Sequence, residues 1–305
     1  MTKAYLVTGA SSGIGLDLSK YLAELGHTVY ATVRKQEDYD CLKTIENIKP
    51  VMVDVSNLQQ IAEARTFIDQ QGTGLDGVIN NAGLGHIGFL HTFTEEELKL
   101  LFEVNVHGPV RMINTFLDLL MVSKGRVLNI GSQAGSVSMS CFGPYAMTKH
   151  ALEAYTAALA DELKPQGVHV SIIQPGAVAT EIFDNGRAPN IERFERAKEP
   201  FDEAAKQVIH ALNQPMEFDE NQAESASNRN PSSTDIVNQA AQHALFSDQP
   251  KSRYLVGTRW EGGRVINMLI ERLLDANDCP SLQYSKEELF EQIEAHMENR
   301  NDSRW

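Results

Sequence analysis

Short apolar stretches, rich in β-branched residues, alternate with helical stretches along the first two-thirds of this 305-residue chain. Strands that are apolar throughout and separated by helices are typical of a parallel sheet with helices on both faces. We therefore predict an α/β fold with a doubly wound, mostly parallel sheet. The expected strands are Ala4–Val7, Thr28–Val33, Val51–Val55, Leu75–Asn80, Arg126–Gly131 and Val168–Gln174.

The helical stretches carry local signals for where a helix begins. The longest, Thr94–Val122, starts with a residue that can cap it, and Glu97 three residues later predicts a capping box. Ser56 is better placed than Asp54 to cap the helix predicted at Asn57–Gln71.

A glycine-rich turn follows the first strand directly and leads into the helical pattern Leu16–Leu25. Its glycines are Gly9, Gly13 and Gly15, in the spacing G-x-x-x-G-x-G. Glycines let backbone N–H groups approach a pyrophosphate, and a helix N-terminus favours its negative charge. The turn could instead simply link strand to helix, but its position after the first strand favours a phosphate site.

Tyr145 and Lys149 lie four residues apart in a predicted helix, Tyr145–Leu163, and Ser132 precedes them by thirteen positions. Positions i and i+4 share one helix face, so the phenol and the ammonium can meet over one ligand. A neighbouring cation lowers the pKa of a phenol, and a nearby hydroxyl can hold a substrate oxygen. Helices also carry Tyr and Lys for solubility alone, so the pair is either a surface feature or, together with Ser132, an acid–base site.

These residues belong to a set of motifs through which the chain resembles the short-chain dehydrogenase/reductase family over roughly residues 3–182. The helix that carries Lys149 is most similar to the branch with steroid and retinol dehydrogenases. The resemblance implies a Rossmann-type sheet of about seven strands, with a last strand at Arg253–Gly257, and one catalytic domain at 1–257. The motifs occur in family order at Thr8–Gly15, Asn80-Asn81-Ala82-Gly83, Asn105, Ser132, Tyr145 with Lys149, and Pro175-Gly176 through Thr180.

The resemblance also implies the catalytic roles. Ser132 would hydrogen-bond the carbonyl oxygen, and Tyr145 would exchange the proton with it. Lys149 would hold the cofactor ribose and lower the pKa of Tyr145. The backbone carbonyl of Asn105 would hold a water that links Lys149 to solvent. Hydride transfer to or from a nicotinamide would complete the reaction.

The nicotinamide cofactor is expected to be NADP(H). The second strand ends in Val33 where members that use NAD carry Asp, and Arg34 and Lys35 come next. A guanidinium can grip a 2′-phosphate through two hydrogen bonds, and the missing carboxylate removes a repulsion. Arg34 could also be an ordinary loop cation. By resemblance, Asp54 and Val55 would hold the adenine.

The remaining cofactor contacts are also implied by the resemblance. The turn Asn81-Ala82-Gly83 would lie against the adenosine ribose, whereas Asn80 more simply braces the strands. Val178 and Thr180 would hold the nicotinamide carboxamide. The full set of expected cofactor residues is Gly9, Ser11, Ser12, Gly13, Ile14, Gly15, Arg34, Lys35, Asp54, Val55, Asn81, Ala82, Gly83, Tyr145, Lys149, Pro175, Gly176, Val178 and Thr180.

These observations predict an NADP(H)-dependent oxidoreductase that interconverts a carbonyl and an alcohol, acting as a ketone or aldehyde reductase. A non-catalytic NADP(H)-binding regulatory or scaffold protein is an alternative, because fold does not determine function. It would have no need of the Ser132, Tyr145 and Lys149 set. An epimerase or dehydratase would resemble a larger family branch, with a G-x-x-G-x-x-G turn that this chain lacks.

Composition limits the partners. A net charge of −14 argues against nucleic acid, which requires basic patches. The three cysteines are too few and scattered for a disulfide framework or a zinc site, and no carboxylate spacing suggests another metal. Met-Thr-Lys leads at once into a strand, so no signal peptide is expected. The most apolar helical stretch, Ile113–Val122, is too short for a membrane span. We expect a cytoplasmic protein with a small-molecule substrate and no membrane insertion.

Two regions depart from the alternating pattern. Residues 181–231 form an insertion, which is either a substrate lid, as the resemblance implies, or an inert surface segment; Glu217–Asn230 within it has the composition of a mobile connection. Residues 258–305 form a helical C-terminal extension, with Leu289, Ile293 and Met297 on one helix stripe.

A homodimer, possibly extended to a tetramer, is expected, because helices equivalent to Thr94–Val122 and Tyr145–Leu163 pair across a two-fold axis in the family. The first helix carries more apolar residues than one sheet face needs: Phe102, Val106, Met112, Ile113, Phe116 and Leu120. The side chains Met139, Cys141 and Phe142, between Ser132 and Tyr145, are expected either to line an apolar substrate wall or to belong to the core.

Overall fold

A computed structural model of the chain describes residues 2–180, 186–214, 231–281 and 283–298. The described residues form one seven-stranded sheet with the order β3-β2-β1-β4-β5-β6-β7, and every neighbouring pair is parallel. The order reverses between β1 and β4, which makes the sheet doubly wound, as predicted. The strands are β1 (Ala4–Val7), β2 (Thr28–Val33), β3 (Ile48–Met52), β4 (Gly77–Asn80), β5 (Arg126–Ile130), β6 (His169–Pro175) and β7 (Arg253–Val256).

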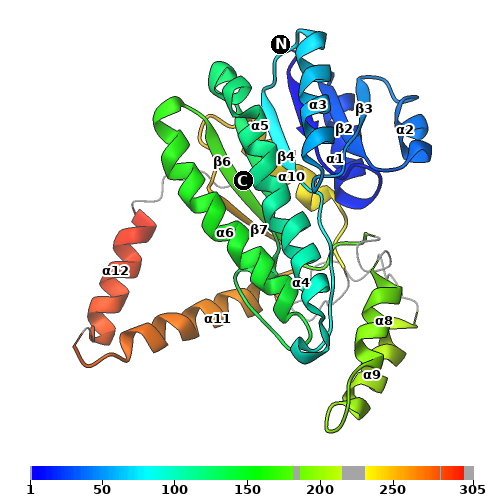
Figure 1. Cartoon of the computed structure of the whole chain (residues 1–305). Coiled ribbons are helices and arrows are strands. Elements are labelled where there is room, and N and C mark those ends of the chain that lie inside the picture. Colours follow the sequence, from blue (N-terminus) through cyan, green and yellow to red (C-terminus); the bar gives the residue numbers. More distant parts are fainter. Residues whose placement is uncertain (1, 181–185, 215–230, 282, 299–305) are drawn as a thin grey trace.

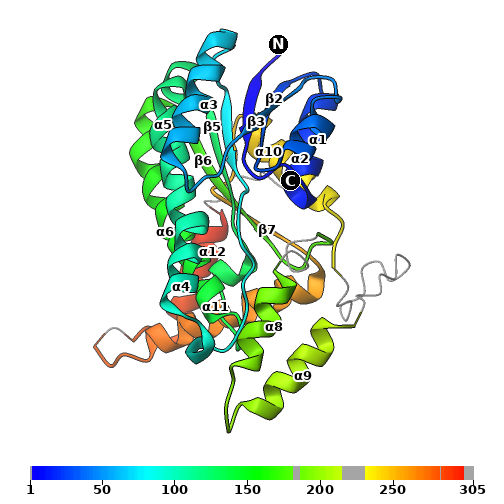
Figure 2. The same cartoon turned by 45° about the vertical axis from the view of Figure 1, so that its right-hand side comes forward.

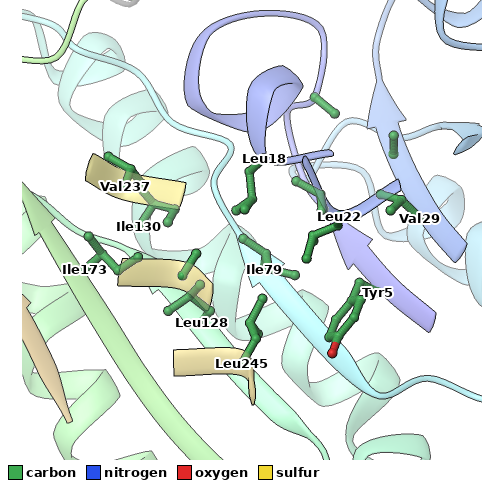
Figure 3. Packing of buried hydrophobic residues seen from close by; sticks show 14 of the residues in the cluster. Tyr5, Leu18, Leu22, Val29, Ile79, Leu128, Ile130, Ile173, Val237 and Leu245 are labelled. Atoms are coloured by element: carbon green, nitrogen blue, oxygen red, sulfur yellow. The ribbon is translucent and has the colours of Figure 1, made fainter. Parts of the chain in front are cut away.

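Helices cover both faces of this sheet (Figures 1 and 2). The helices on one face, α1, α2 and α10, pack into a core with β-strand residues that Figure 3 shows from close by. The helices on the other face, α3, α5 and α6, enclose a second core. The helices are α1 (Gly13–Glu24), α2 (Gln36–Leu42), α3 (Leu58–Gln71), α4 (Glu95–Phe102), α5 (Gly108–Ser123), α6 (Gly143–Leu163), α8 (Arg187–Glu195), α9 (Asp202–Leu212), α10 (Asp235–Phe246), α11 (Arg259–Asn277) and α12 (Lys286–Glu298).

Most predicted elements are confirmed, but the bounds of the third strand and the cap of α3 differ from the prediction. The third strand covers Ile48–Met52 rather than Val51–Val55, because Val33 at the end of β2 pairs with Met52. The register between β2 and β3 thus places the third strand closer to the N-terminus than predicted. The cap of α3 is Asn57, whose side chain accepts from two backbone N–H groups, rather than Ser56.

The long helix expected at Thr94–Val122 is interrupted. Thr94 and Glu97 form the predicted capping box at the start of α4. A π-helical turn, η2 (Glu103–His107), then separates α4 from α5. Such turns insert one residue into the helical ladder and are frequent at functional sites.

The apolar residues expected at a subunit interface are mostly core. Met112, Ile113, Phe116 and Leu120 of α5 have no exposed surface and pack against the sheet within one chain. They are no surplus over the needs of one sheet face, because residues of α3 and α6 belong to the same core. The expectation that these four residues lie at a subunit interface is therefore wrong.

The helices α8, α9 and α11 lie beyond the carboxyl edge of the sheet (Figures 1 and 2). Within the predicted insertion, α8 and α9 pack on a small cluster around Phe194, Ile87 and Ala205. The predicted mobile stretch Glu217–Asn230 lies outside the described residues. In the extension, α11 and α12 form the two expected helices, and no helix in the described part of the chain is long and apolar enough to span a membrane.

Candidate active site

Ser132, Tyr145 and Lys149 meet at one cavity at the carboxyl end of β5. Ser132 follows the strand directly, and the first turns of α6 carry Tyr145 and Lys149. All three side chains line a cavity of about 290 Å³. The Tyr145 hydroxyl is hydrogen-bonded to Ser132, whose Oγ also accepts from the backbone N–H of Ala134 at 3.0 Å. The serine and tyrosine can therefore reach one substrate oxygen together.

Lys149 is held rigidly beside this pair. Its ammonium nitrogen donates to the backbone carbonyl of Ile130 at 2.9 Å and lies 5.6 Å from the centroid of the Tyr145 ring. Only 5% of the residue is exposed. A buried ammonium needs such partners because desolvation penalises its charge.

Burial dominates the ionisation of both catalytic candidates. It raises the pKa of Tyr145 to about 12, against the opposing effect of the hydrogen bond with Ser132. It lowers the pKa of Lys149 to about 8, although the carboxylate of Glu153 acts in the opposite direction. The expected lowering of the Tyr145 pKa by Lys149 is thus not found, and Tyr145 is a protonated donor at neutral pH.

Asn105 lies in the π-helical turn η2 and is 1% exposed. Its side-chain Oδ1 accepts from Leu84 N at 2.8 Å, and its Nδ2 donates to Leu84 O and to Thr148 Oγ1, both at 3.0 Å. These bonds tie the helix to the turn after β4 and to α6, one residue before Lys149. The side chain therefore joins three elements of the site.

The glycine turn after β1 is packed closely against the turn after β4. Gly9 has φ +66°, and a Cβ atom there would lie 2.8 Å from the Cα atom of Ala82. Thr8 Oγ1 accepts from the backbone N–H groups of Asn81 and Ala82. The turn can approach so closely only because position 9 has no side chain.

A second cavity of about 230 Å³ lies along this turn and shares Ile14, Asn81, Gly83, Leu84 and Thr180 with the first. The N-cap of α1 makes no side-chain hydrogen bond, so the first N–H groups of the helix are available to a ligand. A phosphate group fits these donors. A dinucleotide that extends along both cavities is thus compatible with the residues present. The other predicted cofactor residues that line the second cavity are Gly9, Ser11, Ser12, Gly13, Arg34 and Ala82.

The residues expected to select the nucleotide are divided between two environments. Arg34 is exposed at the second cavity. Although burial acts to raise it, the pKa of Asp54 is lowered because Ser56 donates to the carboxylate from N and Oγ and Arg34 lies nearby. Lys35 is the exposed N-cap residue of α2. Val55 is buried, and its side chain faces Gly108 of α5.

The turn after β6, Pro175 to Thr180, lines the first cavity as expected. Its backbone is held by a residue that the sequence analysis did not single out. Glu261 of α11 accepts from Ala177 N through Oε1 at 2.6 Å and from Thr258 N through Oε2 at 2.9 Å. The first turn of the C-terminal extension is therefore attached to the predicted nicotinamide turn.

Four residues of this extension line the first cavity, and none was predicted: Trp260, Glu261, Arg264 and Val265. The sequence contains a signal that could have predicted these four residues. Thr258 and Glu261 have capping-box spacing directly after the last strand, and the structure contains that capping box. A helix that starts at the carboxyl end of a parallel strand faces the ligand side of the sheet.

The segment between Ser132 and Tyr145 supplies apolar side chains to the lining of the first cavity. Met139 and Phe142 line the first cavity, whereas Cys141 packs toward the cluster of α8 and α9.

His86 lines the second cavity and is 8% exposed. Burial and the Arg193 cation lower the pKa of His86 to about 4, so it is neutral.

Comparisons with known proteins identify relatives of this chain. A family model described as short chain dehydrogenase matches residues 3–190. The mitochondrial D-beta-hydroxybutyrate dehydrogenase of Rattus norvegicus is 33% identical over 268 residues, which cover 83% of this chain and 76% of that protein. The structure of a short-chain dehydrogenase from Streptomyces avermitilis has a TM-score of 0.71 at 26% identity and covers 97% of this chain and 98% of that one.

Two more distant structures share the fold and hold different nucleotides. The actinorhodin polyketide ketoreductase with NADPH has a TM-score of 0.69 at 23% identity, over 85% of this chain and 97% of that one. The 3-ketoacyl-(acyl-carrier-protein) reductase of Brucella melitensis with NADH has a TM-score of 0.67 at 22% identity, over 85% of this chain and 98% of that one. The chain therefore belongs to the short-chain dehydrogenase/reductase family, as an oxidoreductase of CH–OH groups whose cofactor is a nicotinamide nucleotide.

Proposed function

We propose that this protein is an NADP(H)-dependent carbonyl reductase that uses Tyr145 as its acid. The observation that carries this proposal is the meeting of Ser132, Tyr145 and Lys149 at one largely apolar cavity beside the glycine turn. A nicotinamide nucleotide, when bound, supplies the hydride. The protein then has to hold the carbonyl oxygen and deliver one proton to it.

Ser132 and Tyr145 perform these two tasks. The Ser132 hydroxyl donates to the carbonyl oxygen and fixes its position. Tyr145, whose protonated form burial favours further by raising its pKa, donates its proton to the developing alkoxide. Lys149 lies close enough to stabilise the tyrosinate that remains, and Asn105 positions the helix turn before it.

The cofactor is assigned to the two adjoining cavities. Gly9, Ser11, Ser12, Gly13 and Ile14 surround its phosphates, with Gly15 allowing the close packing, and Asn81, Ala82 and Gly83 contact its ribose. Arg34 and Lys35 take the 2′-phosphate, Asp54 and Val55 border the adenine, and Pro175, Gly176, Val178 and Thr180 hold the nicotinamide. The exposed guanidinium of Arg34 at the second cavity supports NADP(H) over NAD(H).

The catalytic domain comprises residues 1–257, and the extension at 258–305 adds residues of its first two turns to the lining of the first cavity. The insertion acts as a substrate lid, because α8 and α9 lie beyond the carboxyl edge of the sheet (Figure 2), and residues that end or follow the strands line both cavities. The protein acts as a homodimer in the cytoplasm. Exposed Leu100 of α4 and Met147 of α6 supply apolar surface for the two-fold contact.

The experiment that tests the function is NADPH oxidation, followed by absorbance, over a panel of carbonyl compounds. The panel contains steroids, retinal, aliphatic aldehydes, acetoacetyl thioesters and simple keto acids with their methyl esters. We expect turnover of at least one compound by the wild-type protein and none by Tyr145→Phe. Equal turnover in the two proteins, or none with any compound and either nucleotide, contradicts the proposal.

A further inference from the structure

The cavity of the catalytic candidates contains a cation that the proposed reaction does not use. Arg264 of α11 lines this cavity together with Ser132, Tyr145 and Lys149. Lys149 is committed to the carbonyl of Ile130. Arg264 comes from the C-terminal extension, whereas Ser132 follows β5 and both Tyr145 and Lys149 lie on α6.

The contacts of Arg264 hold it in place without neutralising it. Its guanidinium carbon lies 4.7 Å above the centroid of the Trp260 ring, and Nη2 contacts the sulfur of Met139 at 3.0 Å. A thioether sulfur is a weak acceptor. Among the ion pairs recorded for the described residues, none involves Arg264.

The carboxylate nearest along the helix is already engaged. Glu261, one turn earlier, also lines the cavity, but its oxygens accept from the backbone N–H groups of Ala177 and Thr258. These bonds also fix the first turn of α11, so Arg264 is presented to the cavity from a rigid helix start. A cation between apolar side chains favours an anionic partner, and a carboxylate can accept two hydrogen bonds from a guanidinium.

We propose that Arg264 binds an anionic group of the substrate, so that this enzyme acts on small keto acids. The inference rests on the proposed reductase function and adds the substrate class. The carbonyl oxygen lies at Ser132 and Tyr145 while the carboxylate lies at Arg264. The cavity of about 290 Å³ also borders the nicotinamide turn, which leaves room for a short molecule only.

The test compares each keto acid with its neutral methyl ester. The probes are pyruvate, acetoacetate and 4-oxopentanoate, which vary the distance between carbonyl and carboxylate. For the best acid, we expect kcat/KM of Arg264→Leu to fall about 10- to 150-fold, the range for a lost hydrogen bond to a charged group. The value for its ester should change less than about 3-fold, and Arg264→Lys should be intermediate because lysine makes no bidentate contact.

Arg272→Leu is the matched control, because it removes the same charge from α11 at an exposed position away from the cavity lining. It should leave both substrates unchanged. A wild-type preference for esters, or an equal loss for acid and ester in Arg264→Leu, overturns the inference. Turnover of neutral ketones alone leaves the proposed function standing and removes the keto-acid class.

A binding measurement separates failure of the inference from failure of the function. Trp260 lies against Arg264, so its fluorescence reports a ligand there. If no carbonyl compound is reduced but the acids quench this fluorescence in the wild-type protein and not in Arg264→Leu, the anion site is correct and the reductase function is wrong. If the acids quench neither protein, the anion site is wrong.

Discussion

The ammonium nitrogen of Lys149 donates a hydrogen bond of 2.9 Å to the backbone carbonyl oxygen of Ile130, the last residue of β5. This bond fixes the lysine between the strand end and the helix that carries Tyr145. The position of the Lys149 ammonium is therefore fixed by a backbone carbonyl at the end of β5 and not by a carboxylate at hydrogen-bond distance. This position is compatible with the roles proposed for Lys149 toward Tyr145 and the ribose of the nucleotide.

Tyr145→Phe should lower kcat for any active carbonyl substrate by at least about 10²-fold, the lower end of what a positioned acid contributes. NADPH affinity should stay within a few-fold, since the lost hydroxyl acts on the substrate. Lys149→Ala should damage both quantities, because Lys149 is assigned to the ribose as well. Steady-state absorbance kinetics and calorimetric titration measure the two effects. Substantial residual turnover in Tyr145→Phe would be incompatible with its role as the acid.

The stability of the protein should depend on pH through Lys149. Its pKa is about 8 in the folded protein against 10.5 ordinarily, so the unfolded chain binds more protons between these values. Stability from this group is therefore present above pH 10.5 and is lost as the pH falls through about 8. The difference corresponds to roughly 3 kcal/mol at 1.36 kcal/mol per pKa unit.

Denaturant unfolding of the wild-type protein and of Lys149→Met, between pH 7 and pH 9.5, measures this contribution. Other titrating groups cancel in the difference between the two proteins. We expect the wild-type protein to gain stability relative to Lys149→Met as the pH rises. A flat difference across the window would show that Lys149 is not desolvated.

Arg34→Ala should weaken NADPH binding by roughly 1.5–3 kcal/mol, the range for hydrogen bonds to charged groups, and should barely change NADH binding. Lys20→Ala, an exposed charge on α1, is the matched control and should affect neither nucleotide. Calorimetric titration of the wild-type protein and both variants with NADPH and NADH measures these affinities. A wild-type preference for NADH would reject the assignment of Arg34 to the 2′-phosphate.

Phe116→Ala should destabilise the monomer fold by about 3–5 kcal/mol without changing the oligomeric state, because Phe116 is completely buried against the sheet. Val122→Ala, at a residue 87% exposed near the end of the same helix, should change stability by less than about 0.5 kcal/mol. Thermal or denaturant unfolding gives both values. If Phe116→Ala dissociates a dimer and its stability is retained, Phe116 is an interface residue and not a core residue.

The homodimer is tested by light scattering at micromolar concentration. We expect about twice the 33.8 kDa mass of one chain. Because the buried face of α5 is core, the contact should depend on exposed residues, and Met147→Glu on α6 should shift the mass toward the monomer. A wild-type mass of one chain would remove the dimer from the proposed function.

The sequence alone determined the parallel sheet, the glycine turn and the Ser132, Tyr145 and Lys149 set. Each of these rests on a short-range signal. Strands buried on both faces must be apolar throughout, a turn against backbone needs glycine, and a four-residue spacing places two side chains on one helix face. The capping box of Thr94 and Glu97 was predictable for the same reason, since both partners lie within one turn.

Tertiary structure decided what depends on residues far apart. The register of β2 and β3 moved the third strand, and packing on α3 and α6 turned Phe116 from expected interface into core. Burial, rather than the nearby Lys149, decided the pKa of Tyr145. The bond between Glu261 and Ala177, 84 residues apart, brought Arg264 to the cavity. A local pattern such as the capping box of Thr258 and Glu261 predicts where a helix begins but not which distant element it contacts. The free energy of such a contact arises only when separate elements exclude water from the space between them.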